Sequence, residues 1–325
     1  MEIIEQAVIL AVGNPAHQSQ LTYDRPRTML PALGKPLVVR MMDRLHRIGI
    51  QDYVVVVGEE EGAVASYLNS QWVPNARIQF VMQSASDSLT RILADIARKY
   101  GKPFLVNSYN SFTHPRFPER LLKHREDYGD ALILSGATTT LSTSKRNFFA
   151  LTRDTHRVTA IASEPPTNGP NLTLTDLAIV GQKVVQFLST SLPTTGTFSK
   201  QLMNTFEHYF RAGGLAYIVD TAWLLQVQTD YDLLTLNRHL LDEAVDAHIL
   251  SELPGTVQII PPVRIDPQVS IGAGAKIGPY VYLESGCTVG RDAVVSNAMI
   301  LRGATVVSGE TVSNTIVATR ARVTA

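Results

Sequence analysis

The chain has 325 residues, of which 45% are hydrophobic, and its 29 Lys and Arg side chains balance 29 Asp and Glu side chains. Because it carries neither a net charge nor a block of like charge, we expect no nucleic-acid partner. The single cysteine excludes an intramolecular disulfide framework, and no stretch approaches the ~20 apolar residues that cross a membrane, so we expect a cytoplasmic protein without membrane contact.

The first 135 residues alternate between strand-like and helix-like patterns. Turn residues bound the apolar runs QAVILAV, YVVVVG, PFLVNS and DALILS, while residues 37–45 and 118–127 follow helical spacing. This alternation is typical of βαβ units, and it predicts buried parallel strands with functional loops at their carboxyl ends. Residues 148–215 mix strand-like runs with Ser, Thr and Pro, which favours a substrate-side subdomain inserted on the sheet. A helix over 229–245 closes this part of the chain.

Beyond about Leu253 an aliphatic residue recurs at every sixth position. The positions are Ile259, Ile265, Ile271, Ile277, Leu283, Val289, Val295, Leu301 and Val307. This period predicts a solenoid of triangular coils that is stabilised by stacking, and it resembles the left-handed parallel β-helix of hexapeptide-repeat proteins. We therefore predict two domains, residues 1–250 and 251–325, and we interpret Cys287 as a small core residue.

The segment VILAVGNPAHQSQLTYDRPRTMLPALGKP, residues 8–36, carries a long spaced motif. The pattern LAAGxGTRLxPLTxxxPKxMLPVxGKP lies on residues 10–36 without a gap and matches at LA, Gly13, Leu21, Thr22, Pro26, MLP and GKP. The chain thus resembles the sugar-1-phosphate nucleotidyltransferases, or nucleotide-sugar pyrophosphorylases. The resemblance implies an α/β fold, with a Rossmann-like nucleotidyltransferase domain on a mixed sheet followed by the β-helix. An unrelated Rossmann-like domain is the alternative.

The resemblance also implies a reaction. In this family an oxygen of a sugar-1-phosphate attacks the α-phosphorus of a nucleoside triphosphate, and pyrophosphate leaves. Backbone N–H groups of the loop hold the triphosphate, an arginine and a lysine offset its charge, and two aspartates hold magnesium.

Several loop positions of the family pattern are changed in this chain. Ala11 and Gly13 match and are the expected nucleotide-binding positions, but Pro15 replaces the second glycine and has no N–H to donate. His17 replaces the arginine and cannot offer its bidentate fork, and a solvated loop histidine is the favoured interpretation of this residue. Arg27 stands at the lysine position and keeps the charge.

The base-reading and sugar-side motifs are changed as well. QSASDSLT aligns with the base-reading pattern QxxPLGTA, so Gln83 is a candidate for a nucleobase contact or a polar residue at a strand end. Ser88 replaces the close-approach glycine of that pattern, and Asp87 adds a second side chain there. On the sugar side, Glu164 matches the EKP motif, whereas Pro165 replaces its lysine.

The two positions that hold magnesium in the family lack carboxylates here. The resemblance places Tyr109 and Gln226 on them, so we assign no metal ligand and no cofactor to this chain. An amide and a phenol are poor magnesium ligands. The candidate substitutes are Asn107, Asn110, Asp220 and Asp230.

These departures favour a catalytically silent family member. On this hypothesis the chain is a regulatory or scaffolding subunit that still binds a nucleotide or nucleotide sugar. It would assemble through the β-helix with copies of itself or with an active paralogue. The alternative is an active nucleotidyltransferase with rearranged catalytic residues. A hexapeptide acyltransferase is disfavoured because those enzymes use a histidine near the coil junctions, and the last histidine, His248, precedes the repeats.

Overall fold

The structure is a computed structural model that describes residues 4–12, 19–72, 75–84, 86–143, 148–152, 156–166, 172–190, 202–243 and 247–324. The chain forms two compact units. The first unit comprises residues 1–13 and 38–226, and the second unit comprises residues 14–37 and 227–325. The predicted partition into residues 1–250 and 251–325 stays a prediction.

Nine strands of the described residues form one mixed sheet in the first unit, in the order β5-β4-β1-β6-β11-β8-β12-β10-β9. The central strands β4, β1 and β6 pair in parallel, whereas β11 runs antiparallel to both β6 and β8. This confirms a mixed α/β domain. The strands are β1 Gln6–Ala11, β4 Asp52–Gly58, β5 Arg77–Gln83, β6 Phe104–Ser108, β8 Leu132–Ala137, β9 Phe149–Thr152, β10 Arg157–Ala162, β11 Leu172–Val180 and β12 Ala216–Thr221.

The predicted subdomain over residues 148–215 is wrong in one respect. Strands β9 and β10 extend the edge of the main sheet, and β9 also pairs with β11 in the middle of it. The alternation of buried and exposed residues that half-covered strands need is weak in this part of the sequence. The loops rich in Ser, Thr and Pro therefore suggested a separate body where the structure adds strands to the sheet.

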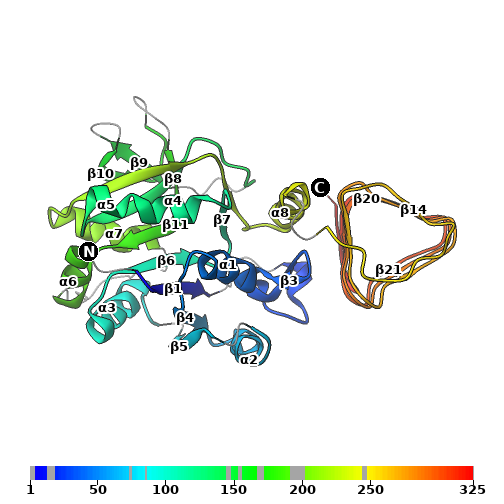
Figure 1. The fold of residues 1–325 in the computed structure, drawn as a ribbon, viewed down its shortest axis with the longest axis horizontal. Helices are drawn as coiled ribbons and strands as arrows, with labels where there is room; N and C mark the ends of the chain where they lie inside the picture. The colour runs from blue at the N-terminus through cyan, green and yellow to red at the C-terminus, as the bar shows by residue number, and fades with distance from the viewer. Residues whose placement is uncertain are drawn as a thin grey trace. The chain divides into compact units, whose positions relative to one another are not determined.

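Helices cover the sheet because their apolar faces meet its buried strands (Figure 1). Side chains of β1, β4 and β6 share one hydrophobic core with α3, α6 and α7. Every helix among the described residues is too short or too polar to span a membrane. The helices are α1 Leu37–His46, α2 Gly62–Gln71, α3 Leu89–Tyr100, α4 Phe117–Lys123, α5 Arg125–Tyr128, α6 Gln182–Thr190 and α7 Leu202–Arg211.

The second unit is a stack of parallel coils together with one helix and the segment of residues 19–37. Gln258 pairs in parallel with Lys276 and Ile259 with Ile277, one coil further along the chain. Figure 1 shows the coils end-on as a triangle. The elements are η1 Gln20–Thr22, η2 Arg27–Met29, β2 Pro31–Ala32, β3 Lys35–Pro36, α8 Asp230–Asp242, β14 Gln258–Ile259, β15 Val263–Ile265, β16 Ser270–Ile271, β17 Lys276–Ile277, β18 Val281–Leu283, β19 Thr288–Val289, β20 Val294–Ile300, β21 Thr305–Val306, β22 Thr311–Val317 and β23 Arg322–Thr324.

The parallel coils agree with the predicted β-helix, whose handedness stays a prediction. The six-residue count slips by one residue late in the repeats. Ile277 pairs with Val295, but Leu283 pairs with Ile300, so the coil is one residue shorter between these two pairs. As a result Val306 is buried, and the predicted anchor Val307 is 60% exposed. Cys287 lies in the core, where burial raises the pKa of its thiol to about 12.

Candidate functional site

The carboxyl ends of the parallel strands β1 and β6 lie side by side. Ala11 ends β1 and is fully buried, and the Leu10 carbonyl accepts a hydrogen bond from the Tyr109 N–H at 3.1 Å. This contact fixes Tyr109, which is 4% exposed, directly after β6. Gly13 and His17, two sequence-predicted loop positions of the family pattern, lie outside the described residues.

The two predicted metal positions lie on or beside one two-stranded sheet. Strand β7 (Ser111–Thr113) pairs antiparallel with β13 (Leu224–Gln226), so that Gln226 lies opposite Ser111, two residues after Tyr109. The Gln226 N–H donates to the Ser142 hydroxyl at 2.6 Å. Arg44 supports β7 from α1, donating to the Thr113 carbonyl at 2.7 Å. The pairing therefore places Gln226 opposite a residue that lies two positions after Tyr109. That Tyr109 and Gln226 form one functional site stays a prediction.

Asp176 is a site residue that the sequence analysis missed. It lies where the pairing of β11 with β8 shifts register, and such bulges redirect side chains beside functional sites. Its backbone N–H donates to the Ser111 hydroxyl at 3.3 Å, and its carboxyl forms a hydrogen bond with Ser108. Burial raises the pKa of Asp176 above its usual range, more than the Ser108 contact lowers it. A charged residue inside the apolar run LTLTDLAIV was the signal for it.

The polar side chains of the predicted base-reading segment form hydrogen bonds with residues of the same segment. Gln83 ends β5, is 7% exposed, and donates from Nε2 to the Asp87 carbonyl at 3.3 Å. The Asp87 carboxylate accepts hydrogen bonds from the Ser84 N–H at 3.0 Å and the Ser84 hydroxyl at 2.9 Å, which lowers its pKa. The Ser88 hydroxyl accepts from the Arg91 N–H and caps α3. These side chains therefore have local partners before any base is bound.

Arg27 lies in the second unit and is 8% exposed. Its Nη2 approaches the Asp230 carboxylate at 3.9 Å, while Nε and Nη2 have no hydrogen-bond partner among the described residues. Asp230 is itself engaged, because its Oδ1 accepts a hydrogen bond from the Ser19 hydroxyl at 2.6 Å. Arg27 is thus a buried cation with donors left over, which is the state of a group that an anion could satisfy.

Glu164 lies in another part of the first unit. It follows β10 and lines an open hollow of about 480 Å³ together with Ser163, Asn204 and Glu207, and with the apolar side chains of Phe148, Ile161 and Ala162. This lining contains neither Tyr109 nor Gln226. The predicted sugar contact therefore stands apart from the residues that β7 and β13 bring together.

The arrangement of the first unit is that of a known family. Residues 6–224 match the nucleotidyl transferase family, and residues 259–325 match the GMPPB C-terminal domain. The chain belongs to the nucleotidyl transferase family. The mannose-1-phosphate guanylyltransferase 1 of Arabidopsis thaliana is 22% identical over 96% of this chain and 85% of its own length. The UTP–glucose-1-phosphate uridylyltransferase AglF of Haloferax volcanii is 25% identical over 52% of this chain and 69% of its own.

Solved structures of nucleotidyltransferases share the fold. A crystal structure of a UDP-glucose pyrophosphorylase complexed with UDP-glucose superposes with a TM-score of 0.59 at 16% identity, over 74% of this chain and 100% of the other. An inositol-1-phosphate CTP transferase from T. maritima superposes with a TM-score of 0.57 at 17% identity, over 71% of this chain and 92% of the other. At these identities the likeness shows the fold.

The residues that the sequence motifs align with the family's metal positions do not fit magnesium. Tyr109 and Gln226 offer a phenol and a neutral amide, whereas magnesium is held by carboxylate oxygens together with substrate phosphates. The neighbouring Asp176 is a carboxyl whose burial disfavours the charged form. Of the possible substitutes, Asn107 is 2% exposed and donates to the Met41 sulfur, and Asp230 holds Ser19 in the second unit.

Proposed function

We propose that this nucleotidyl transferase family member is catalytically silent or very weak, binds a nucleotide or nucleotide sugar, and serves as a regulatory or scaffolding subunit. The proposal is supported by two neutral residues, Tyr109 in the turn between β6 and β7 and Gln226 at the end of β13. The sequence motifs align these two residues with the magnesium carboxylates of the family. Without those carboxylates the charge that develops on the leaving pyrophosphate is not neutralised. Loss of a single preorganised group of this kind already costs about 2.7–4 kcal/mol of transition-state stabilisation.

Binding is supported separately by Arg27. Its guanidinium is buried, and Nε and Nη2 form no hydrogen bond with the residues that the structure describes, so a phosphate group would satisfy these donors. One similar solved structure is complexed with UDP-glucose, and one relative is a mannose-1-phosphate guanylyltransferase. Uridine and guanosine diphosphate sugars are therefore the first ligands to test.

Catalysis is tested by pyrophosphate release. The purified chain is incubated with magnesium or manganese, the common nucleoside triphosphates and a panel of sugar-1-phosphates, beside an active family member as the standard. We expect release at least about 10³-fold slower than the standard, in line with the loss of two charged groups. Robust release that disappears in Arg27→Met would overturn the silent assignment. Release that disappears in Asp176→Asn would give that carboxyl the metal role and favour the active alternative.

Binding is tested by thermal shift and calorimetry with the nucleotides and nucleotide sugars, each with magnesium and with a chelator. A ligand of the folded state raises the melting temperature. We expect the shift to persist in the chelator because the part of the chain that the structure describes contains no cluster of three His, Cys, Asp or Glu side chains that could hold a metal ion. Arg27→Met should abolish the shift, whereas Arg27→Lys, which restores the family residue, should keep it. Arg322→Met, which removes a guanidinium elsewhere in the second unit, is the matched control. No shift with any ligand would leave only the scaffolding role.

We further propose that assembly uses the β-helix. Its coils present exposed apolar side chains, with Ile260 47% exposed and Val307 60% exposed. The test is the molecular mass of the full chain in solution, alone and mixed with an active paralogue. Ile260→Asp and Val307→Asp should lower that mass to the monomer's. A chain that is monomeric alone and that does not bind the paralogue would contradict this role.

A further inference from the structure

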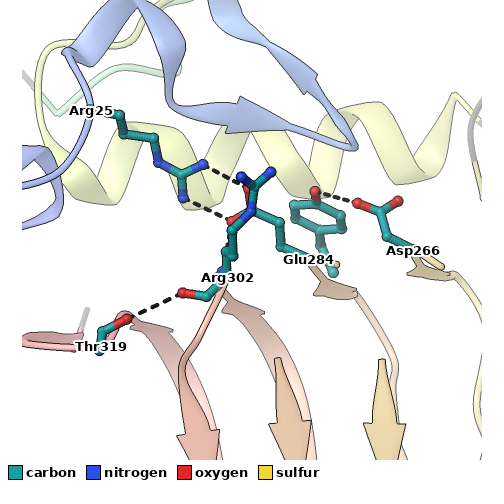
Figure 2. Close-up of polar contacts among 6 residues, drawn as sticks. Arg25, Asp266, Glu284, Arg302 and Thr319 are labelled. Carbon is teal, nitrogen blue, oxygen red and sulfur yellow. Dashed lines mark hydrogen bonds and ion pairs between the residues drawn. The ribbon is translucent and has the colours of Figure 1, made fainter. Parts of the chain in front are cut away.

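Residues 19–37, which continue the family motif, are held against the coils of the second unit by a buried ion pair. Arg25 donates from Nη1 and Nη2 to the two oxygens of Glu284 at 2.7 and 2.8 Å, as the paired dashed lines in Figure 2 show. The side chains are 19% and 6% exposed. A bidentate pair of this kind has a fixed geometry, and burial shields it from water and salt.

Glu284 is itself held by the coil beneath it. Its Oε2 also accepts the Arg302 backbone N–H at 2.8 Å, and the Arg302 guanidinium lies 3.9 Å from Oε1. The hydroxyl of Thr319 bonds the Arg302 carbonyl and links the next coil to the same corner (Figure 2). These contacts hold the Glu284 carboxylate in place, so Arg25 is bound to an element of the coils that is itself fixed.

The connection from Arg25 to Arg27 is short and stiff. Pro26 stands between them with φ −65° and ψ 157°, and it precedes the 3₁₀ turn that begins at Arg27. Proline fixes its own φ and restricts the residue before it. The position of the Arg25 guanidinium thus constrains the place where the Arg27 side chain starts.

A second contact holds the far end of the segment. Gly34 has φ 77°, and a Cβ there would collide with the guanidinium of Arg264. Arg264 is fixed by Asp266, whose Oδ1 accepts from its Nε at 2.8 Å, and Oδ2 of Asp266 accepts from the Tyr282 hydroxyl at 2.7 Å. The segment therefore packs against one coil at Gly34 and is bound to a neighbouring coil by Arg25.

We propose that Glu284 is a positioning residue for the motif segment, holding Arg25 so that Arg27 is presented for an anionic ligand. The coils then act on ligand binding through one ion pair, in addition to any role in assembly. The positioning itself depends only on contacts within the second unit. Its consequence for affinity rests on the nucleotide binding proposed above.

The test compares hydrogen exchange and ligand binding in variants of the full chain. Glu284→Gln keeps an acceptor for the Arg302 N–H and removes the charge that binds Arg25. Backbone amides of residues 19–37 should exchange about tenfold faster or more, while those of residues 263–317 keep their wild-type rates. The affinity for the nucleotide sugar that wild type binds should fall about tenfold or more when it is measured well below the melting temperature of the variant. Arg25→Met should reproduce both effects while leaving the coils intact.

Two further variants separate positioning from general stability. Arg25→Lys keeps the charge but loses the fork, so its exchange and affinity should fall between those of wild type and Arg25→Met. Glu310→Gln removes another carboxylate that pairs with an arginine of the coils, Arg322, and should change neither readout. Unchanged exchange over residues 19–37 in both Glu284→Gln and Arg25→Met would overturn the proposal. Faster exchange with unaltered affinity would also overturn it.

The outcomes distinguish this inference from the proposed function. If wild type binds no nucleotide or nucleotide sugar, the proposed ligand binding fails and the affinity arm has no signal. The exchange arm still decides whether Glu284 holds the segment. If wild type binds and Glu284→Gln binds equally well, the function stands and the positioning role is refuted.

Discussion

The turn after β6 with the end of β13 in the first unit, and the contact of Arg25 with Glu284 in the second unit, differ in the charge of their polar side chains. In the first region, Tyr109 and Gln226 are neutral, and the partly buried Asp176 has its charged form disfavoured. At the coil corner, Glu284 is 4% exposed and forms a bidentate pair with Arg25. The first region thus holds uncharged side chains at the two positions that the motifs assign to magnesium ligands, and the second holds a charged pair that fixes the motif segment. The proposed function depends on this difference.

The same contrast appears in how the polar groups are satisfied. Gln83, Asp87 and Ser88 find their partners within a few residues, in the turn and cap before α3. Arg25 and Glu284 are 259 residues apart. Polar groups that already have local partners offer a ligand few additional hydrogen bonds. A distant partner makes the position of one segment depend on another, which is the basis of the proposed positioning role.

The largest expected effect is the cost of breaking the coil corner. Glu284→Ala leaves Arg25 buried without its carboxylate and should lower the free energy of unfolding by about 3–5 kcal/mol. Gln226→Ala at the end of β13 removes a neutral side chain and should lower the free energy of unfolding by about 1 kcal/mol. Urea unfolding followed by circular dichroism measures both. Equal costs would remove the contrast between the two regions.

The apolar interior of the coils gives the next effect and tests the one-residue slip. Leu283 is fully buried, so Leu283→Ala should cost about 2–5 kcal/mol. Val307→Ala should cost about 0.5 kcal/mol or less because that side chain is exposed. The sequence period by itself predicts similar costs at the two positions. Thermal and urea unfolding of both variants therefore separates the pattern from the structure.

The cap of α3 sharpens the comparison on the sheet side. Ser88→Ala should cost about 1 kcal/mol and Ser88→Gly only a few tenths, because glycine is tolerated at an N-cap. Glycine is also the family residue at this position, so Ser88→Gly removes a side chain from the base-reading segment. A gain in nucleotide affinity for Ser88→Gly, measured by calorimetry, would indicate that the serine obstructs the ligand. Unchanged affinity with the expected loss for Ser88→Ala would leave Ser88 as a cap only.

The smallest effect concerns Asp176 and depends on pH. Its pKa in the folded chain is raised above the ordinary value of 3.8 by burial, so the folded state binds this proton more tightly than the unfolded state. The stability it contributes is complete below that ordinary value and is lost as the pH rises through the folded pKa. Asp176→Asn should therefore stabilise the chain more at about pH 7 than at about pH 4. Melting curves at both pH values check the sign, and an opposite trend would mean that the carboxylate has a cationic partner.

The sequence by itself determined the family and the two kinds of architecture. The gapless motif over residues 10–36, the alternation of apolar runs and the six-residue repeat are local patterns, and each reports which residues face a core. These features indicated a mixed α/β domain and stacked parallel coils. The family motifs also predict that Tyr109 and Gln226 share one site, because such motifs carry positional information that composition lacks. That assignment stays a prediction.

Only the tertiary structure decided which polar groups meet. Asp176 reaches Ser108 and Ser111 through a register shift in β11, and Arg25 reaches Glu284 across nearly the whole chain. It also decided that Val306, rather than Val307, is buried, because the β20 coil is one residue short. Pairing and register depend on contacts between residues far apart in sequence. A local period cannot specify such contacts, since a shift of one residue changes which side chains face the interior.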